Sequence, residues 1–317
     1  MTRAAAAARS AGITRRHAGY GRWMDRVGLV VHPRRALEAA LTTVHAWAEE
    51  VGAEVAQIRT PGSEREVAPS AEPEDCRLII ALGGDGTALV ALRAAAPARR
   101  PVLGIACGSL GALTAVTAAE LRGALEKVAA DDWEPRPLPA LDVETSAGDA
   151  IPPSVNDFVV VRRGAGQVAI AVSVDDEPYV RFAGDGVVVA TPLGSSAYTL
   201  AAGGPIVAPG AGTMVVTPLA PHGGCCPPLV VGADSRIELQ IEPGHGGARL
   251  EGDGQPAGDL DRDDTRRLAI GFRPDHVTLV ALGEQEPMIA GLRRRRVIID
   301  SPRLLARDDR EAARPYL

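Results

Sequence analysis

The stretch that decides the fold is Leu78-Ile79-Ile80-Ala81-Leu82-Gly83-Gly84-Asp85-Gly86-Thr87, which runs on into Ala88-Leu89-Val90-Ala91-Leu92-Arg93-Ala94. The first apolar run predicts a buried strand, and the alanine- and leucine-rich run predicts a helix. Glycines at the junction let backbone N–H groups approach an anion, and the positive end of the helix dipole favours one there. The sequence therefore predicts an α/β unit that binds phosphate through Gly83, Gly84, Gly86 and Thr87.

Asp85 is the acid inside this glycine-rich junction. A carboxylate beside phosphates is repelled unless a cation or a hydroxyl proton lies between them. Asp85 is therefore a candidate base, or a metal-organising group, in phosphoryl transfer. An ordinary Asp-Gly turn is the alternative interpretation, but the doubled glycine before Asp85 and the helix after it favour the phosphate site.

Composition limits the classes of function. The chain has 317 residues, of which 46% are hydrophobic and 23% charged, and its net charge is −6. This length predicts two domains. No apolar run could span a bilayer and the acidic balance disfavours polyanions, so we expect neither membrane nor nucleic-acid partners. Cys76, Cys107, Cys225 and Cys226 lack metal-binding spacing, which indicates a reduced, cytoplasmic setting.

Residues 1–23 are rich in Ala and Arg and contain no acid. A targeting peptide and a start codon placed too far upstream both explain this composition. The second is favoured because no secretory apolar core is present and Met24 stands where a compact domain would begin. We therefore set residues 1–23 apart as an extension that is disordered or upstream of the true start.

Residues 24–140 alternate between strand and helix patterns, which predicts an open, Rossmann-like α/β sheet. Strands are expected at 27–31, 54–58, 78–82 and 101–105, and helices at 36–50 and 119–130. The first strand is not followed by G-x-G-x-x-G, so the conventional dinucleotide fingerprint is absent from its usual place.

Residues 141–282 consist of short Val-rich segments separated by turn signals, which predicts an all-β second domain. Strands are expected at 155–161, 168–174, 186–190, 214–217, 236–241, 267–272 and 277–282. Between two of them, Asp185 to Val207 reads DGVVVATPLGSSAYTLAAGGPIV, with an acid, hydroxyls, a tyrosine and four glycines. Such a segment can line a nucleotide pocket, although a Gly-rich connection between strands is the alternative.

Several of these motifs resemble those of NAD kinases. Similar lipid kinases and phosphofructokinases share the GGDGT loop, but lipid kinases lack the second signature, DG…TPTGSTAY…GGP. This chain matches that signature with Asp185-Gly186, Thr191 to Tyr198 and Ala202 to Val207. Three further segments match the family. Asn156-Asp157 corresponds to an Asn-Glu pair, residues 217–222 correspond to a TPIxPH stretch, and Asp253-Gly254-Gln255 corresponds to a late Asp-Gly turn.

The resemblance implies transfer of a phosphoryl group from ATP, or from polyphosphate, to the 2′-hydroxyl of the adenosine ribose of NAD, which yields NADP. It implies that Asp85 is the general base or polarises this hydroxyl, and that Gly83, Gly84, Gly86 and Thr87 hold phosphates. Asn156 and Asp157 match the pair that binds NAD, and Asp185 matches the acid at its nicotinamide part. The other nucleotide-binding residues implied are Ser195, Ser196, Ala197, Tyr198, Thr199 and Gln255.

The resemblance also implies Mg²⁺ or another divalent cation. Because no Lys-bearing Walker loop is present, we expect this ion to be held mainly by the substrate phosphates, with weak protein ligation and no dedicated metal-binding residues. A homo-oligomer, dimer or tetramer, is implied, as is the return of residues 283–317 to the first domain. Replacing Asp85 by Asn is expected to abolish most turnover with little loss of stability.

The chain departs from the family pattern in places. Where the family reads G-[VI]-N-x-G-x-L-G-F-L, Gly104 to Leu113 has Ala106 and Ala112, which removes an amide and an aromatic ring. Ala201 replaces a Ser, and Gly223 to Pro227 replaces a Ser-Leu-Ser-x-Arg stretch. The predicted base is unchanged, so we expect an active but divergent kinase. A lipid or sugar kinase and a non-catalytic NAD(P)(H) sensor remain alternatives.

Three further features have structural interpretations. Arg293 to Arg296 is interpreted as a solvated run, or one paired with acids such as Asp308-Asp309, and is given no site. Cys225-Cys226 is interpreted as an inert pair, because adjacent cysteines rarely close a relaxed disulfide. His222 fits a turn-stabilising imidazole as well as a phosphate contact.

Overall fold

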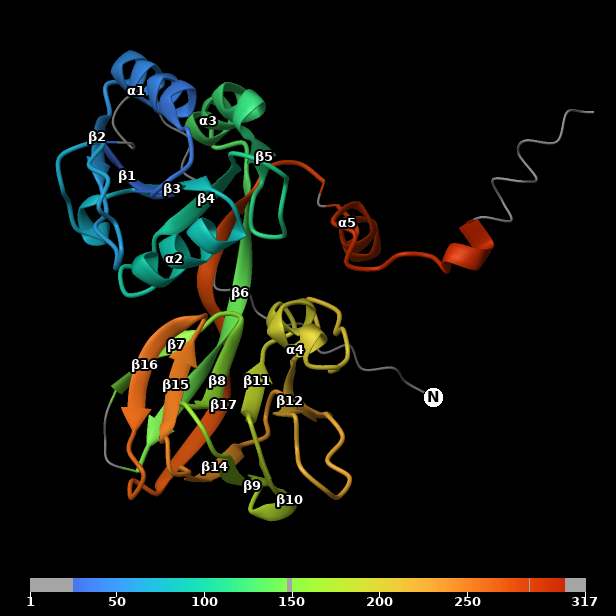
Figure 1. Cartoon of the computed structure of the whole chain (residues 1–317). Coiled ribbons are helices and arrows are strands. Elements are labelled where there is room, and N and C mark those ends of the chain that lie inside the picture. The colour runs from blue at the N-terminus through green and yellow to red at the C-terminus, as the bar shows by residue number, and fades with distance from the viewer. Residues whose placement is uncertain (1–24, 147–149, 285, 306–317) are drawn as a thin grey trace, which may run out of the picture.

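The computed structural model describes residues 25–146, 150–284 and 286–305 (Figure 1). The extension expected at 1–23, the predicted domain start at residue 24 and the acids Asp308-Asp309 lie outside the described residues. Two halves lie one above the other in Figure 1, and the long strands β6 (Glu134–Thr145) and β17 (Arg266–Ala281) run between them.

The first half is an open parallel sheet in the order β2-β1-β3-β4. Its strands are β1 (Arg26–Val31), β2 (Glu54–Gln57), β3 (Leu78–Gly83) and β4 (Pro101–Ala106), with the short β5 (Val116–Thr117) beside β4. Its helices are α1 (Glu38–Val51), α2 (Asp85–Ala95) and α3 (Leu121–Ala129), with 3₁₀ turns at Pro73–Asp75 and Ala118–Glu120. The strands and helices expected here are confirmed, with ends that differ by a few residues.

Helices cover both faces of this sheet because its central strands are apolar on both sides. Ile80 of β3 packs with Trp47 of α1 and Leu125 of α3 in one apolar cluster. The neighbouring Ile79 packs with Leu92 of α2 in another. Successive side chains of a strand point to opposite faces, so α1 and α3 lie on one side of the sheet and α2 on the other.

The strand order changes direction between β1 and β3. From β1 the chain passes through α1 to β2 on one side, and then returns to β3 on the other side. In open α/β sheets, ligands bind at such a switch point, outside the carboxyl ends of the strands. The loop that begins at His32 and the junction at Gly84 both lie at this edge.

The second half consists of two packed sheets. One has the order β13-β12-β11-β8-β15-β16. The other continues the first-half sheet through β17, β14, β9 and β10, with β6 beside β17 and β7 beside β6. Phe158 and Val189 of the first sheet pack against Ile170 and Leu239 of the second, forming a sandwich core. The β-rich second domain is therefore confirmed. Its further elements are β7 (Ala150–Ser154), β8 (Asp157–Arg162), β9 (Val168–Val174), β10 (Glu177–Gly184), β11 (Gly186–Ala190), β12 (Thr213–Leu219), β13 (Leu229–Gly232), β14 (Ile237–Glu242), β15 (Ala248–Gly252), β16 (Gln255–Leu260), a 3₁₀ turn (Gly194–Ser196) and α4 (Tyr198–Ala201).

One expectation about this half is wrong. The strands expected at 267–272 and 277–282 are the single strand β17, whose register against β6 shifts between Arg273 and Val277. The residues between Arg273 and Val277, which were expected to form a turn, form an irregularity within the strand, because pairing with β6 continues on both sides of them. At its end, β17 pairs in parallel with β4, with Thr278 opposite Pro101, so the sheet runs through both halves.

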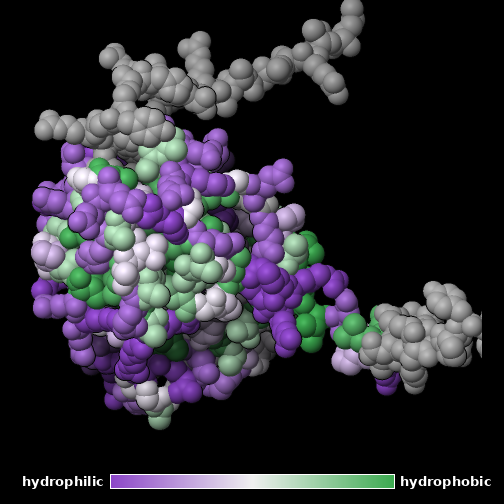
Figure 2. Space-filling model, turned by 90° about the horizontal axis from the view of Figure 1, so that it is seen from above, coloured by the Kyte–Doolittle hydropathy of each residue, from purple (hydrophilic) through white to green (hydrophobic). Residues whose placement is uncertain are grey.

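Residues 283–305, apart from residue 285, carry α5 (Met288–Arg294). Arg294 of this helix donates a hydrogen bond to the carbonyl oxygen of Leu110 in the first half, with an N–O distance of 2.6 Å. Among the described residues, no helix has the length and apolarity needed to cross a membrane. On the face seen in Figure 2, hydrophilic and hydrophobic residues are intermixed.

Candidate active site

Asp85 is the first residue of α2, and Gly84 is the N-cap residue before it, in an extended conformation. Gly86 and Thr87 therefore belong to the first helical turn. Gly83 ends β3 so close to this turn that a Cβ on it would lie 2.1 Å from the Thr87 hydroxyl oxygen. Glycine at 83 thus permits the tight passage from strand to helix that brings the first N–H groups of α2 to the sheet edge.

The carboxylate of Asp85 is held by the backbone of a neighbouring loop. Its Oδ2 accepts the N–H of Ala112 at 2.8 Å, and its Oδ1 accepts the N–H of Leu113 at 2.9 Å. A Cβ on Gly111 would lie 1.9 Å from Oδ1, so the carboxylate is packed directly against that glycine. A carboxylate offers about four lone-pair positions, and two remain to accept a substrate hydroxyl proton.

Arg35 is a site residue that the sequence analysis missed. The ring Nδ1 of His32 accepts the N–H groups of Arg34 and Arg35 at 3.1 and 3.2 Å, which fixes the turn after β1. Nη1 of Arg35 then donates to the carbonyl oxygen of Cys107 at 2.7 Å, after β4. A Cβ on Gly84 would lie 3.9 Å from Nη2 of Arg35, so this cation lies beside the start of α2.

The charge around Arg35 is positive. No carboxylate among the described residues forms an ion pair with Arg35, and the pKa of His32 is lowered by burial and by the charges of Arg35 and Arg34. The available signal was His32-Pro33-Arg34-Arg35 directly after the first predicted strand, at the edge where ligands bind. In the structure, Arg35 from this segment lies beside Gly84 of the glycine-rich junction.

Asn156 and Asp157 lie at the start of β8, against a turn of the β15-β16 hairpin. Asp253 in that turn accepts the N–H groups of Val155, Asn156 and Asp157 at 2.9, 2.7 and 3.3 Å. Asp157 is only 6% exposed. Burial, followed by the charges of Asp253 and Glu251, raises the pKa of Asp157 to about 7.

α2 contacts this turn as well as the Asp85 loop. Nη1 of Arg93 donates to the carbonyl oxygen of Gly252 at 2.5 Å, and its Nε lies 4.0 Å from Oδ2 of Asp253. The helix that begins with Asp85 is thereby tied to the second half near its other end. The relative position of Asp85 and Asn156 is set through α2.

The segment Thr191 to Ala201 divides into buried and exposed residues. Ser195 is buried, and its hydroxyl donates to the carbonyl oxygen of Pro192 at 2.6 Å and accepts the N–H of Val207 at 2.9 Å. Thr199 is also buried, whereas Ala197 and Tyr198 are exposed. A Cβ on Gly194 would lie 2.0 Å from the carbonyl oxygen of Asn156, so this segment packs on the Asn156-Asp157 pair.

Asp185 lies apart from this group. β8 and β11 are antiparallel, with Ala190 opposite Asp157 and Gly186 opposite Val161. Asp185 is thus at the opposite end of these strands, about 17 Å from Asp157 at the usual rise per residue. It forms an ion pair with Nε of Arg162 at 2.5 Å.

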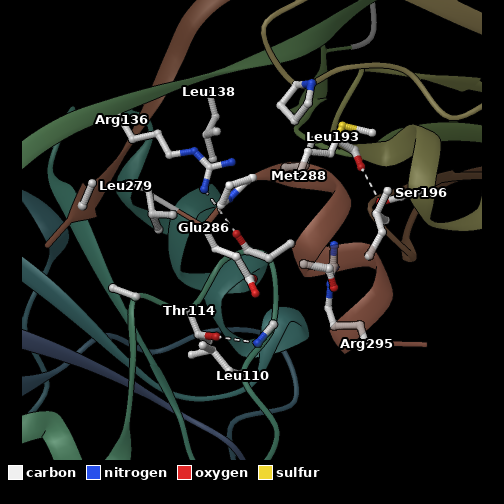
Figure 3. A pocket seen from close by; sticks show the side chains of 18 of the residues that line it. Leu110, Thr114, Arg136, Leu138, Leu193, Ser196, Leu279, Glu286, Met288 and Arg295 are labelled. Atoms are coloured by element: carbon white, nitrogen blue, oxygen red, sulfur yellow. Dashed lines mark hydrogen bonds between the residues drawn. The ribbon is translucent and has the colours of Figure 1, made fainter. Parts of the chain in front are cut away.

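A cavity of about 580 Å³ lies between the 110–115 loop, β6 and α5 (Figure 3). Gly111, Ala112 and Ser196 line it, together with Arg136 and Arg294. Of the other predicted residues, Gln255 lines a separate cavity of about 1330 Å³ along α2. The structure therefore places Ser196 with the Asp85 loop, and Gln255 elsewhere.

The interpretation of Arg293 to Arg296 as a run paired with acids is confirmed for Arg293 and Arg294, although their partners are Asp300 and Glu286. Arg293 pairs with Asp300 at 2.9 Å, as an exposed ion pair. Arg294, however, pairs with Glu286 at 2.8 Å and lines the 580 Å³ cavity, as does Arg295. The run therefore contributes to the wall of the candidate site because α5 folds back onto the first half.

The cysteines and His222 do not line the cavity beside the Asp85 loop. All four cysteines are free thiols, and burial raises the pKa of Cys76 and Cys107. His222 contacts the side chain of Gln167. In the part of the chain that the structure describes, no three His, Cys, Asp or Glu residues gather as a metal-binding group.

A helix start that presents N–H groups, a cation and a single carboxylate at a topological switch point is typical of a nucleotide-binding phosphotransferase. Two family models match the chain, the ATP-NAD kinase N-terminal domain over residues 10–133 and the ATP-NAD kinase C-terminal domain over residues 147–280. The chain therefore belongs to the ATP-NAD kinase family. The first match begins inside the segment that the sequence analysis set apart.

Individual relatives agree with this assignment. NAD kinase 1 of Streptomyces avermitilis is 33% identical, over 89% of this chain and 90% of the relative. The NAD kinase of Heliobacterium modesticaldum is 35% identical over 66% of this chain and 74% of its own. An Archaeoglobus fulgidus NAD kinase solved with ATP is 26% identical with a TM-score of 0.66, covering 86% of this chain and 99% of that one. A yeast NADH kinase complexed with NADH, 22% identical, shares the fold with a TM-score of 0.71, over 85% and 86% of the two chains.

Proposed function

We propose that this protein transfers a phosphoryl group from ATP or polyphosphate to the 2′-hydroxyl of the adenosine ribose of NAD, forming NADP. The observation that carries the proposal is the Asp85 carboxylate, held by the N–H groups of Ala112 and Leu113 at the start of α2. The relatives named NAD kinase support the choice of acceptor. The Archaeoglobus neighbour, solved with ATP, supports the choice of donor.

Asp85 accepts the proton of the 2′-hydroxyl. A sugar hydroxyl has a pKa far above neutral, so the proton moves to the carboxylate only as the bond to phosphorus forms. The ribose oxygen attacks the terminal phosphorus of the donor, the bond from phosphorus to the bridging oxygen breaks, and ADP or a shortened polyphosphate leaves. Two backbone N–H groups already orient the carboxylate, so little reorganisation is needed during this step.

The first half holds the phosphates in this proposal. Gly83, Gly84, Gly86 and Thr87 bring the N-terminal N–H groups of α2 to the donor, and Arg35 supplies positive charge beside Gly84. Mg²⁺ or another divalent cation bound by the donor phosphates would neutralise further charge on them. No residue of this chain is assigned as a dedicated ligand of that ion.

The second half holds the coenzyme. Asn156, Asp157, Ser196, Ala197 and Tyr198 are proposed to bind its adenosine side and the adjoining groups. Ser195 and Thr199 are buried, so their proposed contribution is to shape this segment. Gln255 is proposed to act from the α2 side, where it lines the larger cavity. The distance of Asp185 from Asp157 suits its implied place at the nicotinamide end of the coenzyme.

The assembly and compartment are also proposals. We infer a homo-oligomer, a dimer or tetramer, from the resemblance to NAD kinases. The cytoplasm is proposed because the four cysteines are free thiols, which suits a reducing compartment.

A matrix of two donors and two acceptors tests the function. Purified protein is incubated with Mg²⁺, with ATP or polyphosphate as donor and NAD or NADH as acceptor, and the formation of NADP or NADPH is followed. We expect product with at least one pair. Absence of product with all four pairs would contradict the proposal. Nucleotide-induced thermal stabilisation without turnover would instead support a non-catalytic sensor.

A further inference from the structure

Arg136 lies on β6, in the wall of the 580 Å³ cavity beside the Asp85 loop. Figure 3 shows its side chain reaching from the strand into the cavity that Glu286 and Met288 also line. Neither the sequence motifs nor the proposed mechanism gives this residue a role.

The guanidinium of Arg136 has little to bind within the protein. Its Nη1 donates to the carbonyl oxygen of Ala112 at a long 3.3 Å. No carboxylate of the described residues forms an ion pair with it. Glu286, an acid in the wall of the same cavity, is already paired with Arg294 at 2.8 Å. Most of the donor capacity of Arg136 is therefore free.

Burial makes this arrangement costly. Removal from water lowers the pKa of Arg136, and no neighbouring carboxylate acts in the opposite direction. A half-buried guanidinium without an acid partner destabilises a fold, since the cost of removing it from water is not returned by an ion pair. Such groups persist where a ligand supplies the missing anion.

The position of Arg136 relative to Asp85 suggests which anion this is. The N–H of Ala112 is donated to Asp85, and the carbonyl oxygen of the same residue accepts from Arg136. The Asp85 carboxylate and the Arg136 guanidinium thus bind the N–H and the carbonyl oxygen of the same residue, Ala112. A group bound by Arg136 is therefore held close to the hydroxyl that is proposed to react at Asp85.

We propose that Arg136 binds a phosphate oxyanion of a substrate, through the planar pair of donors that suits phosphate. The phosphate comes either from the diphosphate of the coenzyme or from the donor. The inference rests on the proposed function, because that function supplies these two anions, but it is tested by binding and stability rather than by turnover.

The test compares Arg136→Met, which keeps the length of the side chain and removes its charge, with Arg136→Lys. Arg122→Met is the control, because Arg122 is a surface arginine of α3 that pairs with Glu50 and Glu126. Isothermal titration calorimetry measures binding of NAD and of inorganic tripolyphosphate in separate experiments. Thermal unfolding without ligand is measured for all variants.

We expect Arg136→Met to weaken at least one ligand about tenfold or more, with Arg136→Lys between it and the wild type. Weaker binding of NAD would show that Arg136 binds the diphosphate of the coenzyme. Weaker binding of tripolyphosphate would show that Arg136 binds a phosphate of the donor. The melting temperature of Arg136→Met should be unchanged or raised, because an unpaired buried charge is removed. Arg122→Met should bind both ligands as the wild type does.

Unchanged affinity of Arg136→Met for both probes overturns the proposal. A lowered melting temperature with both affinities unchanged would show that Arg136 is structural, which overturns it as well. Failure of the proposed function gives a different result, since wild-type protein would then bind NAD or tripolyphosphate without forming NADP.

Discussion

Asp157 and Asp253 are joined by two reciprocal hydrogen bonds. The N–H of Asp253 donates to the carbonyl oxygen of Asp157 at 2.9 Å, and the N–H of Asp157 donates to Oδ1 of Asp253 at 3.3 Å. This arrangement places two buried carboxylates at one turn, and burial raises the pKa of both. Asp253 accepts three backbone N–H groups, which act on its pKa in the direction opposite to burial. For Asp157, the neighbouring charges of Asp253 and Glu251 add to the effect of burial.

The raised pKa of Asp157 makes stability depend on pH. Its pKa is about 7 in the folded chain, against an ordinary value of 3.8. Between these values the folded state binds a proton that the unfolded state has lost, so the free energy of unfolding falls as pH rises. The loss amounts to a few kcal/mol at most. Asp157→Asn should remove this slope, as measured by urea unfolding from pH 4 to 8.

The comparison of wild type with Asp157→Asn isolates this effect, because other titrating groups are common to both chains. Above pH 7 the variant should be the more stable of the two. Parallel stability curves across this range would show that Asp157 does not titrate there.

Asp85→Asn should reduce turnover by a factor on the order of 10² to 10⁴, as expected for loss of a general base. The sequence alone predicts little loss of stability, but the structure predicts a loss of about 1–3 kcal/mol. An Asn amide would direct an N–H group at one of the backbone N–H groups of Ala112 and Leu113. NADP formation and urea unfolding measure the two effects, and a variant with the full rate would remove Asp85 from the mechanism.

Gly111→Ala tests the position of Asp85 without changing the carboxylate. The new Cβ would lie 1.9 Å from Oδ1 of Asp85, so the carboxylate must move. We expect a loss of turnover close to that of Asp85→Asn, and a loss of stability of about 1–3 kcal/mol. Gly123→Ala is the matched control, since this α3 glycine has open space around its Cβ position and should gain up to about 1 kcal/mol. Equal rates for the two variants would contradict the proposed role of the loop.

Arg35→Ala should raise the KM for ATP about tenfold while leaving the KM for NAD near that of the wild type, because the cation lies beside the start of α2. Arg35 is exposed and forms no ion pair with the described residues, so the melting temperature should change little. Arg236→Ala serves as the control, because Arg236 forms an exposed ion pair with Glu144 and lines neither cavity. A rise confined to the KM for NAD would place Arg35 on the coenzyme instead.

Local sequence patterns predicted most of the fold. The alternation of apolar strands and amphipathic helices up to residue 130 was sufficient to identify β1 to β4 and α1 to α3. The continuity of β17 was missed, because Arg273-Pro274-Asp275 reads as a turn while long-range pairing with β6 holds the strand together. At these residues, long-range strand pairing outweighs the local preference for a turn.

The site was predictable only where its chemistry lies in one short stretch. Asp85 and the adjoining glycines are contiguous, so sequence alone identifies them. Arg136 and Arg294 come from two distant segments, and each is one arginine among many until the sheet order and α5 bring them to the same cavity. The Asp85 carboxylate is held by the backbone N–H groups of Ala112 and Leu113. Because almost every residue has such a group, the side chains at these positions do not reveal the contact.

The most direct measurement is a crystal structure of the protein with bound NAD. We expect the 2′-oxygen of the adenosine ribose within about 2.6–3.2 Å of a carboxylate oxygen of Asp85. Coenzyme bound with that oxygen well beyond hydrogen-bonding distance of Asp85 would contradict it.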